Sequence, residues 1–570
     1  MRNSAGGYGV FAKDNVDCEC KEMKYILIAA AVIAVLIVLK VTGDRKNKRN
    51  WLLYAEKSFG IKRRFDEDLK DRMNQIRVLY DIEKNLVPKE KQVDEITWND
   101  LNLDDIFAMV NHTDSFAGEQ NLYSRLHILC GNEKHFEKQE KLIEQFDSDS
   151  EMRNKVRISL SSLGKMASSY HIPEIVNKLD EQKRTLSLFP YILLGVFLAS
   201  VVAAVVLHSS TSFMIVLNVG IFNLILNSVF KMTNTSKMHT LFILTRLIGS
   251  ASEINGIMKD KNERISAIVK KMKKIPELMS MFHIGSDRSD DPFLTIFEYL
   301  FGAFMFDFIT YDIMLREMLK YKEEYMELYD YVGDIDCAIA VLSFRNSLDK
   351  YCIPKITKER RFELKECVHP AVNNAVPNDF SYSSNVILTG SNASGKSTFI
   401  KMAAINLILG QTINTCTAEY AVIPECSVMT SMAVRDDVIT GESYYIKEIK
   451  YLKRMTESVN EKRLMFFAID EILKGTNTRE RIAASKAVLK YFSDKNCILI
   501  VATHDTELAN AFDNSFENYY FTKNVSDGDI SFDYKLHKGI SKTTNAIRLL
   551  ELIGFPDEII KNASAQSGVS

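Results

Sequence analysis

A glycine-rich loop constrains the fold of this chain more than any other feature of its sequence. Residues 390–398 read Gly-Ser-Asn-Ala-Ser-Gly-Lys-Ser-Thr, which completes the pattern G-x-x-x-x-G-K-[ST]. The apolar run 386–388 before the loop predicts a strand, and residues 397–409 after it predict a helix that ends at Gly410. A strand, this loop and a helix in that order form a phosphate-binding site, because the glycines let successive backbone N–H groups point inward. A glycine turn that only opens a helix is the alternative, and the flanking elements argue against it.

The positions of the loop predict contacts with a nucleotide and its metal ion. The inward N–H groups and the helix N-terminus favour phosphate oxygens, and Lys396 is expected to reach the β- and γ-phosphates. The Ser397 hydroxyl is expected to bind Mg²⁺. The predicted nucleotide-binding residues are Gly390, Ser391, Asn392, Ala393, Ser394, Gly395, Lys396, Ser397 and Thr398.

Two further apolar runs end in polar side chains that suit the same site. The run 464–469 ends in Asp470 and Glu471, which are expected to orient Mg²⁺ through its water shell and to polarise the attacking water, respectively. The run 498–502 delivers His504 to the same edge of the sheet, where ligands bind at strand carboxyl ends. A lone histidine is usually structural, but this placement predicts a γ-phosphate sensor. The predicted cofactors are ATP and Mg²⁺.

The composition indicates a globular chain of several domains, since 570 residues that are 46% apolar can bury more than one core. The formal net charge of -2 excludes a global basic field, so any nucleic-acid surface has to be a local patch. The nine cysteines are scattered and include no metal-like CxxC pair, which is typical of reduced cytosolic thiols. We interpret the C-x-C pair of Cys18 and Cys20 as incidental, with a metal site or a disulfide as the alternatives.

Three apolar stretches predict membrane-spanning helices. Residues 25–41 are almost free of polar side chains, and the basic cluster that follows them argues against a cleaved signal peptide. Residues 188–207 and 213–230 are separated by so short a loop that we expect a helical hairpin. Buried core helices are the alternative, because three asparagines would lie in the second span. Basic residues beside these stretches predict a multi-pass protein of the cell membrane, with the lipid bilayer as a partner and the C-terminal domain in the cytoplasm.

The remaining stretches are mainly helical up to residue 354. Residues 42–94 are rich in charged side chains, and we interpret them as a solvated helical stretch. Residues 244–272 carry apolar side chains at three- and four-residue spacing, which predicts one long amphipathic helix whose stripe is most simply a packing face. Strands and helices alternate after residue 354, with Asp527-Gly528 as a hairpin turn.

Five ordered segments of the C-terminal region are similar to the ATPase domain of MutS-type DNA mismatch repair proteins. They are Thr389 to Thr398 for the loop T-G-x-N-x-x-G-K-S-T, Asp470 to Thr478 for D-E-x-x-x-G-T-x-T, Ala502 to Leu508 for A-T-H-x-x-E-L, Asp436-Asp437 through Ser443 to Glu448 for D-D-x-x-x-G-x-S-T-F-x-x-E, and His369-Pro370 with Val376 to Asp379 for the entry segment. The closing segment from Tyr534 to Pro556 is similar as well. The resemblance is firm over the last 200 residues and looser over the helical region from residue 95.

The resemblance implies an α/β phosphate-loop ATPase domain of the ABC/MutS-like class at the C-terminus, preceded by an α-helical core domain. The apolar stretches add transmembrane helices to that core domain, which is a departure from the family. The predicted divisions are an extracytoplasmic tail (1–24), a transmembrane helix (25–41), a charged juxtamembrane helical segment (42–94), a first helical core segment (95–187), a transmembrane hairpin (188–230), a second helical core or lever segment (231–354) and the ATPase domain (355–570).

The resemblance also implies partners. Ser443 matches the family's serine that reaches the nucleotide of a partner subunit, so a homodimer with Glu471 and His504 in one subunit and Ser443 acting in trans is expected. Tyr444 departs from the family pattern at the next position. DNA binding is implied too, although the family's mismatch-reading domain has no room here. Phe65-Asp66-Glu67 fits its Phe-x-Glu wedge, and we interpret that match as chance.

Three functions follow from these observations. The first is a membrane-anchored ATPase that engages mismatched or branched DNA. The second is an ATP-driven machine that remodels a membrane or a partner protein and has lost DNA recognition. An ABC-type transporter is the third, and the small number of spans and the absence of an LSGGQ-like sequence argue against it.

Overall fold

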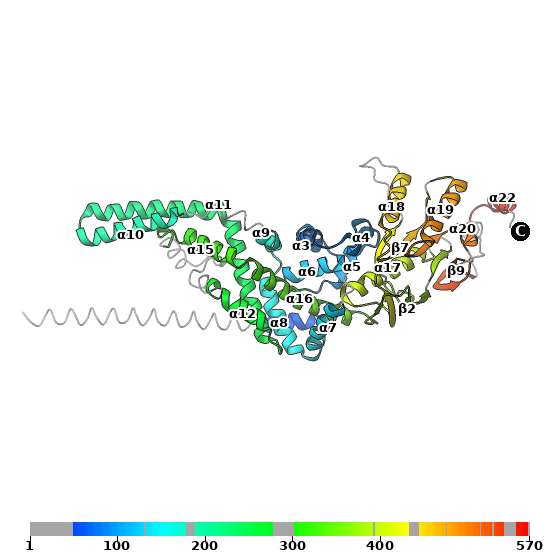
Figure 1. The fold of residues 1–570 in the computed structure, drawn as a ribbon, viewed down its shortest axis with the longest axis horizontal. Helices are drawn as coiled ribbons and strands as arrows, with labels where there is room; N and C mark the ends of the chain where they lie inside the picture. Colours follow the sequence, from blue (N-terminus) through cyan, green and yellow to red (C-terminus); the bar gives the residue numbers. More distant parts are fainter. Residues whose placement is uncertain are drawn as a thin grey trace, which may run out of the picture.

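The computed structural model describes residues 49–129, 133–177, 188–276, 301–382, 384–390, 394–432, 444–474, 476–512, 515–526, 529–540 and 554–567. Within these ranges the molecule is elongated. A helical hairpin projects at one end, a helical body forms the middle, and a domain of strands and helices lies at the other end (Figure 1). The predicted span 25–41 lies outside the described residues.

The helical body is built around one long helix, α16 (Lys322–Ser347). It packs against α5 (Leu103–Val110), α6 (Phe116–His127), α7 (Glu133–Ser148), α8 (Ser150–Leu163), α9 (Ile172–Asn177) and α11 (Ser210–Ile257). The other helices of this body and its extensions are α2 (Glu67–Ile76), α3 (Val78–Glu83), η1 (Lys89–Lys91), α4 (Glu95–Asp100), α5 (Leu103–Val110), α6 (Phe116–His127), α7 (Glu133–Ser148), α8 (Ser150–Leu163), η2 (Ala167–His171), α9 (Ile172–Asn177), α12 (Glu263–Met272) and α15 (Phe306–Lys320). Asp336 of α16 fixes the start of α6, because its buried carboxylate accepts hydrogen bonds from the backbone N–H groups of Asp114 and Ser115.

The prediction of a solvated stretch over residues 42–94 is wrong for its second half. Leu69, Ile76, Leu79 and Val93 are each at most 5% exposed and belong to the main core. Their charged neighbours face outward, so the high charge density of the sequence hid an amphipathic pattern. Asp66 caps α2 by accepting a hydrogen bond from Leu69 N, which gives the Phe65-Asp66-Glu67 triplet a local structural role.

The projecting hairpin consists of α10 (Phe189–Leu207) and the first half of α11 (Ser210–Ile257). Both α10 and residues 210–234 of α11 are long and apolar enough to cross a membrane by length and composition. The helix α11 does not stop near residue 230, because it continues into the body after a local break in helical geometry at Asn234. A single helix, α11, therefore connects the hairpin tip to the helical body (Figure 1).

The single amphipathic helix predicted over residues 244–272 is wrong. The structure has α11 up to Ile257 and a separate α12 from Glu263. Asn262 ends the intervening turn as the cap of α12, and its backbone N–H donates to Asn255 Oδ1 over 2.8 Å. The apolar stripe is continuous across the break because Leu244, Ile248 and Ile268 all enter one core.

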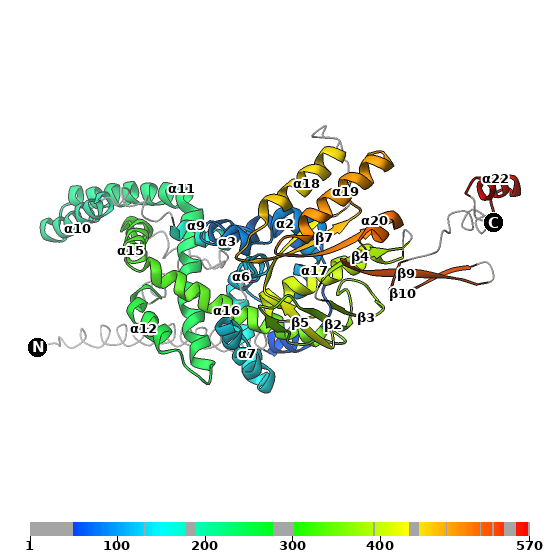
Figure 2. The same cartoon turned by 45° about the vertical axis from the view of Figure 1, so that its right-hand side comes forward.

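The C-terminal domain contains two sheets. The smaller has the strand order β1-β5-β2-β3 and the larger has the order β10-β9-β4-β8-β7-β6. Strands β9, β4, β8, β7 and β6 are parallel, and β10 is antiparallel to β9. The bounds are β1 (Lys355–Thr357), β2 (Phe362–Cys367), β3 (Asn378–Tyr382), β4 (Asn385–Thr389), β5 (Tyr420–Pro424), β6 (Cys426–Ser431), β7 (Leu464–Asp470), β8 (Cys497–Thr503), β9 (Phe516–Ser526) and β10 (Asp529–Lys538). The ribbon of β9 and β10 reaches beyond the rest of the sheet (Figure 2).

Helices cover both faces of the larger sheet, which makes this domain α/β. Alternate residues of each central strand point to opposite faces, so Val386 and Leu388 join the core that includes α17 (Lys396–Ile413) while Ile387 joins the second core. The second core is closed by α19 (Thr478–Ser493) and α20 (Thr506–Ala511), with α18 (Tyr444–Ser458) beside them. The last described helix is α22 (Asp557–Ser567).

Helix α17 (Lys396–Ile413) passes through Gly410, so the predicted helix end there is wrong. A Cβ atom at position 410 would lie 2.4 Å from Ile423 Cδ1 and 3.2 Å from both Cys416 Sγ and Pro354 Cγ. Gly410 is therefore required by close packing, and it does not terminate the helix. The helix ends three residues later at Ile413, and its C-cap is Asn414, whose φ of 53° is left-handed.

Candidate functional site

The register of the larger sheet brings three chain segments to one edge. Thr389 of β4 pairs with Thr503 of β8, and Asp470 of β7 pairs with Ala502 of β8. The residues that follow these strands are Gly390, His504 and Glu471. Because the three strands are parallel and adjacent, these residues emerge side by side at the carboxyl edge of the sheet.

Two glycines shape the loop between β4 and α17. Gly390 has a φ of 146°, and a Cβ there would lie 3.0 Å from the carbonyl oxygen of Phe521. Gly395 has a φ of 106° and a Cβ there would lie 3.3 Å from Tyr534 Cδ1. Both positions therefore favour glycine by conformation and by space. Residues 391–393 lie outside the described residues.

Lys396, the first residue of α17, is folded back over the loop. Its Nζ donates to the carbonyl oxygen of Gly390 over 2.7 Å and lies 3.5 Å from His504 Nδ1. The residue is only 5% exposed. Burial lowers the pKa of Lys396 to about 8, although the nearby carboxylates of Glu471 and Asp470 oppose the shift. Ser397 and Thr398, on the same turn, are exposed to the cleft.

Glu471 is held by two cationic or hydrogen-donating side chains. His504 Nε2 contacts Glu471 Oε1, and Lys474 Nζ lies 2.7 Å from Glu471 Oε2. The hydrogen bond from His504, together with Lys474, lowers the pKa of Glu471 to about 2 against the opposing effect of burial. His504 Nδ1 also lies 2.9 Å from the carbonyl oxygen of Gly390. The ring thus bridges the loop after β4 and the carboxylate after β7.

The backbone at Glu471 is strained. Its φ is 61°, in the left-handed region, and that of Leu473 is 55°. Such a conformation costs a non-glycine residue on the order of 1–3 kcal/mol and persists only where the surroundings enforce it. Two hydrogen bonds do so here: Glu471 N donates to Ala502 O over 3.0 Å, and Lys474 N donates to Glu448 Oε1 over 3.0 Å. Glu448 is a positioning residue on α18, and it is 4% exposed.

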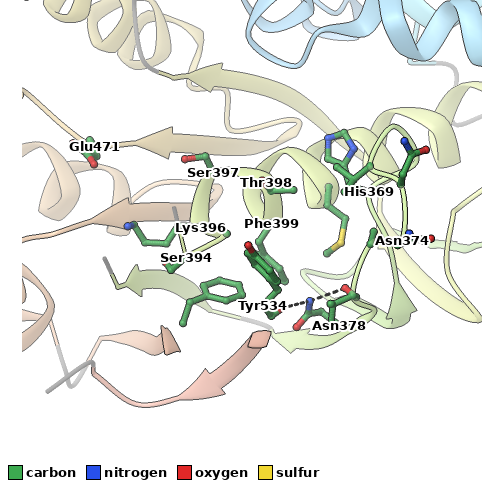
Figure 3. Close-up of a pocket in the computed structure, with 17 residues that line it drawn as sticks. His369, Asn374, Asn378, Ser394, Lys396, Ser397, Thr398, Phe399, Glu471 and Tyr534 are labelled. Carbon is green, nitrogen blue, oxygen red and sulfur yellow. Dashed lines mark hydrogen bonds between the residues drawn. The ribbon is translucent and has the colours of Figure 1, made fainter. Parts of the chain in front are cut away.

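A cleft of about 550 Å³ opens beside these residues. Its polar end has Lys396, Ser397 and Glu471, and its other end has His369 and the loop 372–376 (Figure 3). Phe399 and Tyr534 stand between the two ends (Figure 3). The cleft therefore combines a cation and hydroxyl groups with an apolar, aromatic section, as a phosphate-bearing aromatic ligand requires.

Tyr534 is the functional candidate that the motif analysis did not assign. It is 45% exposed, has a φ of 52° and lies where the register of β10 against β9 shifts. Asn378 holds it there, because Asn378 Nδ2 donates to Tyr534 O over 2.9 Å and Leu536 N donates to Asn378 Oδ1 over 2.8 Å. The entry segment 376–379 was the sequence signal for this contact, because it contains Asn378. The sequence alone did not show that Asn378 pairs with the backbone at Tyr534.

The donor set suits a hard cation that is held partly by its ligand. Ser397 supplies a hydroxyl oxygen and Asp470 a carboxylate at the end of β7. In the ranges that the structure describes, no three His, Cys, Asp or Glu side chains gather as a metal site. One or two protein oxygens plus phosphate oxygens are the usual ligands of Mg²⁺, so these residues fit that ion.

The structure thus brings together Gly390, Lys396, Glu471 and His504, with Ser394, Gly395, Ser397 and Thr398 on the adjoining turn. Ser391, Asn392, Ala393 and Ser443 lie outside the described residues, so their predicted roles stay predictions.

Comparison with known proteins gives one family for this region of the chain. The family model described as MutS domain V matches residues 386–568. The DNA mismatch repair protein MutS of Thermotoga maritima is 28% identical over 259 residues, which are 44% of this chain and 32% of that protein. The proteins of the same name from Leptospira interrogans and Streptococcus gordonii are 27% and 26% identical, over 44% and 45% of this chain. The chain spans about a third of the length of these relatives.

Proposed function

Because this chain belongs to the MutS family through its C-terminal domain, we propose that it is a membrane-anchored ATPase that binds ATP with Mg²⁺ in the cleft at the carboxyl edge of the larger sheet. The observation that carries the proposal is the direct linkage of Lys396, His504 and Glu471 around the Gly390 carbonyl. A cation, a hydrogen-bonding ring and a carboxylate at the end of a phosphate-binding loop are the groups that phosphoryl transfer to water requires.

The residues divide the work of hydrolysis between them. When ATP binds, Lys396 exchanges the Gly390 carbonyl oxygen for oxygens of the β- and γ-phosphates. The base of the nucleotide stacks on the ring of Tyr534. Ser397 and Asp470 would hold Mg²⁺, which would neutralise phosphate charge when bound. Movement of Lys396 frees His504 to turn toward the γ-phosphate, and Glu471 exchanges its contact with His504 for the attacking water. Before this exchange, the low pKa of Glu471 keeps its carboxylate ionised and able to accept a hydrogen bond.

Turnover by the purified full chain tests the ATPase proposal. Lys396→Ala should lose nucleotide binding. Glu471→Gln should retain binding and lose about 10²–10⁴-fold in turnover, which is the usual contribution of a positioned base. Glu457→Gln is the matched control, because Glu457 is an exposed carboxylate on α18 that pairs with Lys453. Turnover in Glu471→Gln equal to that in the control would remove Glu471 from the proposed role.

The site is proposed to be completed by a second copy of the chain, with Ser443 reaching the partner's nucleotide. The support is family membership, since the motif around Ser443 matches the family. A mixture of Lys396→Ala chains with Ser443→Ala chains places both lesions in one site and leaves the other site intact. The mixture should regain turnover relative to either variant alone, and no recovery contradicts the trans arrangement.

Membrane anchoring is proposed for α10 and residues 210–234 of α11. Besides their length and apolar composition, most of their large apolar side chains face away from the protein, which is the reverse of buried core helices. The direct continuation of α11 into the helical body offers a path from the ATP cycle to the bilayer. We extend the proposal to the predicted span 25–41 and to a cytoplasmic location for the ATPase domain.

DNA handling is the second candidate, and it is favoured by the name of the relatives, DNA mismatch repair protein. An ATP-driven membrane or partner-protein machine is the alternative, favoured by the hairpin. Binding of mismatched and branched duplexes to the detergent-solubilised chain separates them. Affinity that falls steeply with salt supports DNA handling, since phosphate contacts release counterions, whereas no binding at low salt leaves the membrane machine.

A further inference from the structure

A third apolar segment lies against the hairpin, in residues 301–311. Their sequence is Phe-Gly-Ala-Phe-Met-Phe-Asp-Phe-Ile-Thr-Tyr, with Asp307 as its one ionisable carboxylate. From Phe306 onward the segment forms the start of α15, which packs on α10 and α11. In contrast to the other helices that flank the body, it lies along the projecting half of α11, beside the hairpin (Figure 2).

The contacts of this segment with α11 are close and follow a regular register. Asn223 Nδ2 donates to Ala303 O over 3.0 Å, and Asn227 Nδ2 donates to Asp307 Oδ2 over 2.8 Å. One turn further along α11, the ring of Phe230 stacks on Phe308, the residue after Asp307, with centroids 3.8 Å apart. The two segments therefore run in the same direction, and the four-residue step from Asn223 to Asn227 matches the step from Ala303 to Asp307.

Glycines permit the close approach. A Cβ at Gly302 would lie 2.6 Å from Leu224 Cδ1, and one at Gly220 would lie 3.2 Å from Phe197 Cε2. Small residues at helix crossings and amide side chains that hydrogen-bond between helices are the usual means of helix association in lipid. The segment is thus docked on the hairpin by contacts of the kind that membrane helices use.

The two hairpin helices and the docked segment form one unit, whose distribution of polar and apolar side chains is the reverse of that in a water-soluble protein. The amides of Asn223 and Asn227 are at most 3% exposed and face inward, where they meet Ala303 and Asp307. Apart from Asn218 and Ser228, the exposed side chains along the apolar stretch of α11 are apolar. The large apolar side chains that the unit exposes include Ile192, Val202, Phe213 and Phe222 of the hairpin, and Phe301 and Phe304 of the segment, which are 46% and 36% exposed. Polar groups inside and apolar groups outside are stable against acyl chains and unfavourable against water.

Polar groups mark the level at which the unit leaves the apolar zone. Tyr191 OH donates to Asp312 Oδ2 over 2.7 Å, and Arg316 Nε donates to the same oxygen over 2.9 Å. Lys231 of α11 follows the apolar stretch at its body end. From Lys231 to Leu224 the helix rises about 10 Å at 1.5 Å per residue. Because the hydrocarbon core is about 30 Å thick, Gly302, which packs against Leu224, lies within the half of the core that is nearer the helical body.

We propose that residues 301–311 are a third membrane-embedded segment, which enters the cytoplasmic half of the bilayer beside the hairpin and exposes Phe301 and Phe304 to lipid acyl chains. The inference rests on the proposed membrane anchoring of the hairpin. In this arrangement Asn227 lowers the cost of placing Asp307 within the apolar zone, because its amide donates a hydrogen bond to the carboxylate.

Quenching of tryptophan fluorescence by brominated lipids tests this placement. Phe301→Trp and Phe304→Trp are each reconstituted as the full chain in phosphatidylcholine vesicles with or without bromine on the acyl chains, and the emission of the parent with its native Trp51 and Trp98 is subtracted. Val202→Trp is the hairpin reference, because the Val202 side chain on α10 is 62% exposed. Leu86→Trp is the aqueous reference, because the Leu86 side chain on the body is 82% exposed. Turnover equal to that of the parent shows that each variant is folded.

The expected result is loss of most of the added emission at positions 301, 304 and 202 in brominated vesicles, and none at position 86. Quenching at 202 without quenching at 301 and 304 overturns the third segment and leaves the anchored hairpin intact. No quenching at any of these positions overturns the anchoring as well. Emission from tryptophan at positions 301 and 304 that is not quenched by brominated lipid, and whose wavelength shifts with protein concentration, would assign the surface around these positions to contact with a second copy of the chain. That result also overturns the proposal.

Discussion

Raising the pH through 8 should weaken nucleotide binding, because Lys396, the cation that we propose binds the phosphates, is buried before the nucleotide arrives. Lys396 is 5% exposed, and burial lowers its pKa to about 8, with the carboxylates of Glu471 and Asp470 only partly opposing the shift. Phosphate oxygens within contact distance favour the charged ammonium, so bound nucleotide raises the pKa again. Binding is thus coupled to proton uptake by Lys396.

The sign and size of this pH dependence follow from the linkage between nucleotide binding and proton uptake by Lys396. Below pH 8 the free lysine is already charged and binding is at full strength. Above pH 8 each pH unit removes about a factor of ten in affinity, or about 1.4 kcal/mol, until the pKa of the bound state is reached. At pH 9 roughly one tenth of the free lysine is charged, so the affinity should be about tenfold weaker than at pH 7, with uptake of about 0.9 proton per nucleotide bound.

Calorimetric titration with ADP at pH 7, 8 and 9, in buffers of different ionisation enthalpy, measures both the affinity and the proton uptake. Lys396→Arg is the matched control, because a guanidinium stays charged over this range and should remove the pH dependence while weakening binding overall. A dissociation constant that is flat from pH 7 to pH 9 in the parent, or an equal slope in Lys396→Arg, would refute the assignment of Lys396 as the buried phosphate ligand.

Three further predictions address the base, the loop after β7 and the core. Tyr534→Ala should weaken nucleotide affinity by about 1–3 kcal/mol, the range for loss of a base–aromatic stack, while Tyr534→Phe keeps it in equilibrium binding; equal affinity in both variants would place the base elsewhere. Glu448→Ala should lower turnover more than affinity, because it releases the Lys474 N–H that holds the strained Glu471 turn, and an unchanged kcat in steady-state assays contradicts that coupling. Gly410→Ala should lower the free energy of unfolding by about 1–3 kcal/mol in a denaturant titration, since its Cβ meets Ile423 at 2.4 Å, whereas Gly249→Ala, with nothing within 4 Å, should be neutral or stabilising.

The sequence predicted the elements whose signals are local. Strands β4, β7 and β8 are continuous apolar runs that end in polar residues, so the edge that carries Gly390, Glu471 and His504 could be predicted before any coordinates. The hairpin turn between β9 and β10 was predicted from Asp527-Gly528 in the same way, although these two residues themselves lie outside the described ranges. MutS family membership, inferred from the ordered motifs, is confirmed by the domain match.

The errors came from features that depend on distant residues. The sequence predicted a helix end at Gly410 because the true cause of the glycine, the close approach of Ile423, is not visible in the neighbouring residues of the sequence. The break between α11 and α12 was hidden because both helices face one core, so that the apolar period continues across the turn. The depressed pKa of Glu471 and its left-handed backbone arise from His504, Lys474 and Glu448, which converge on it only in the fold.

Flotation of reconstituted vesicles, with ATP turnover measured in every fraction, tests the central claim that this ATPase site is held at a bilayer. The full chain is reconstituted, washed at high salt and alkaline pH, and floated through a density gradient beside Lys396→Ala. Both proteins should float with the lipid after the wash, and turnover should float with the parent alone. Protein that stays at the bottom of the gradient, or floating protein whose turnover does not depend on Lys396, would contradict the account.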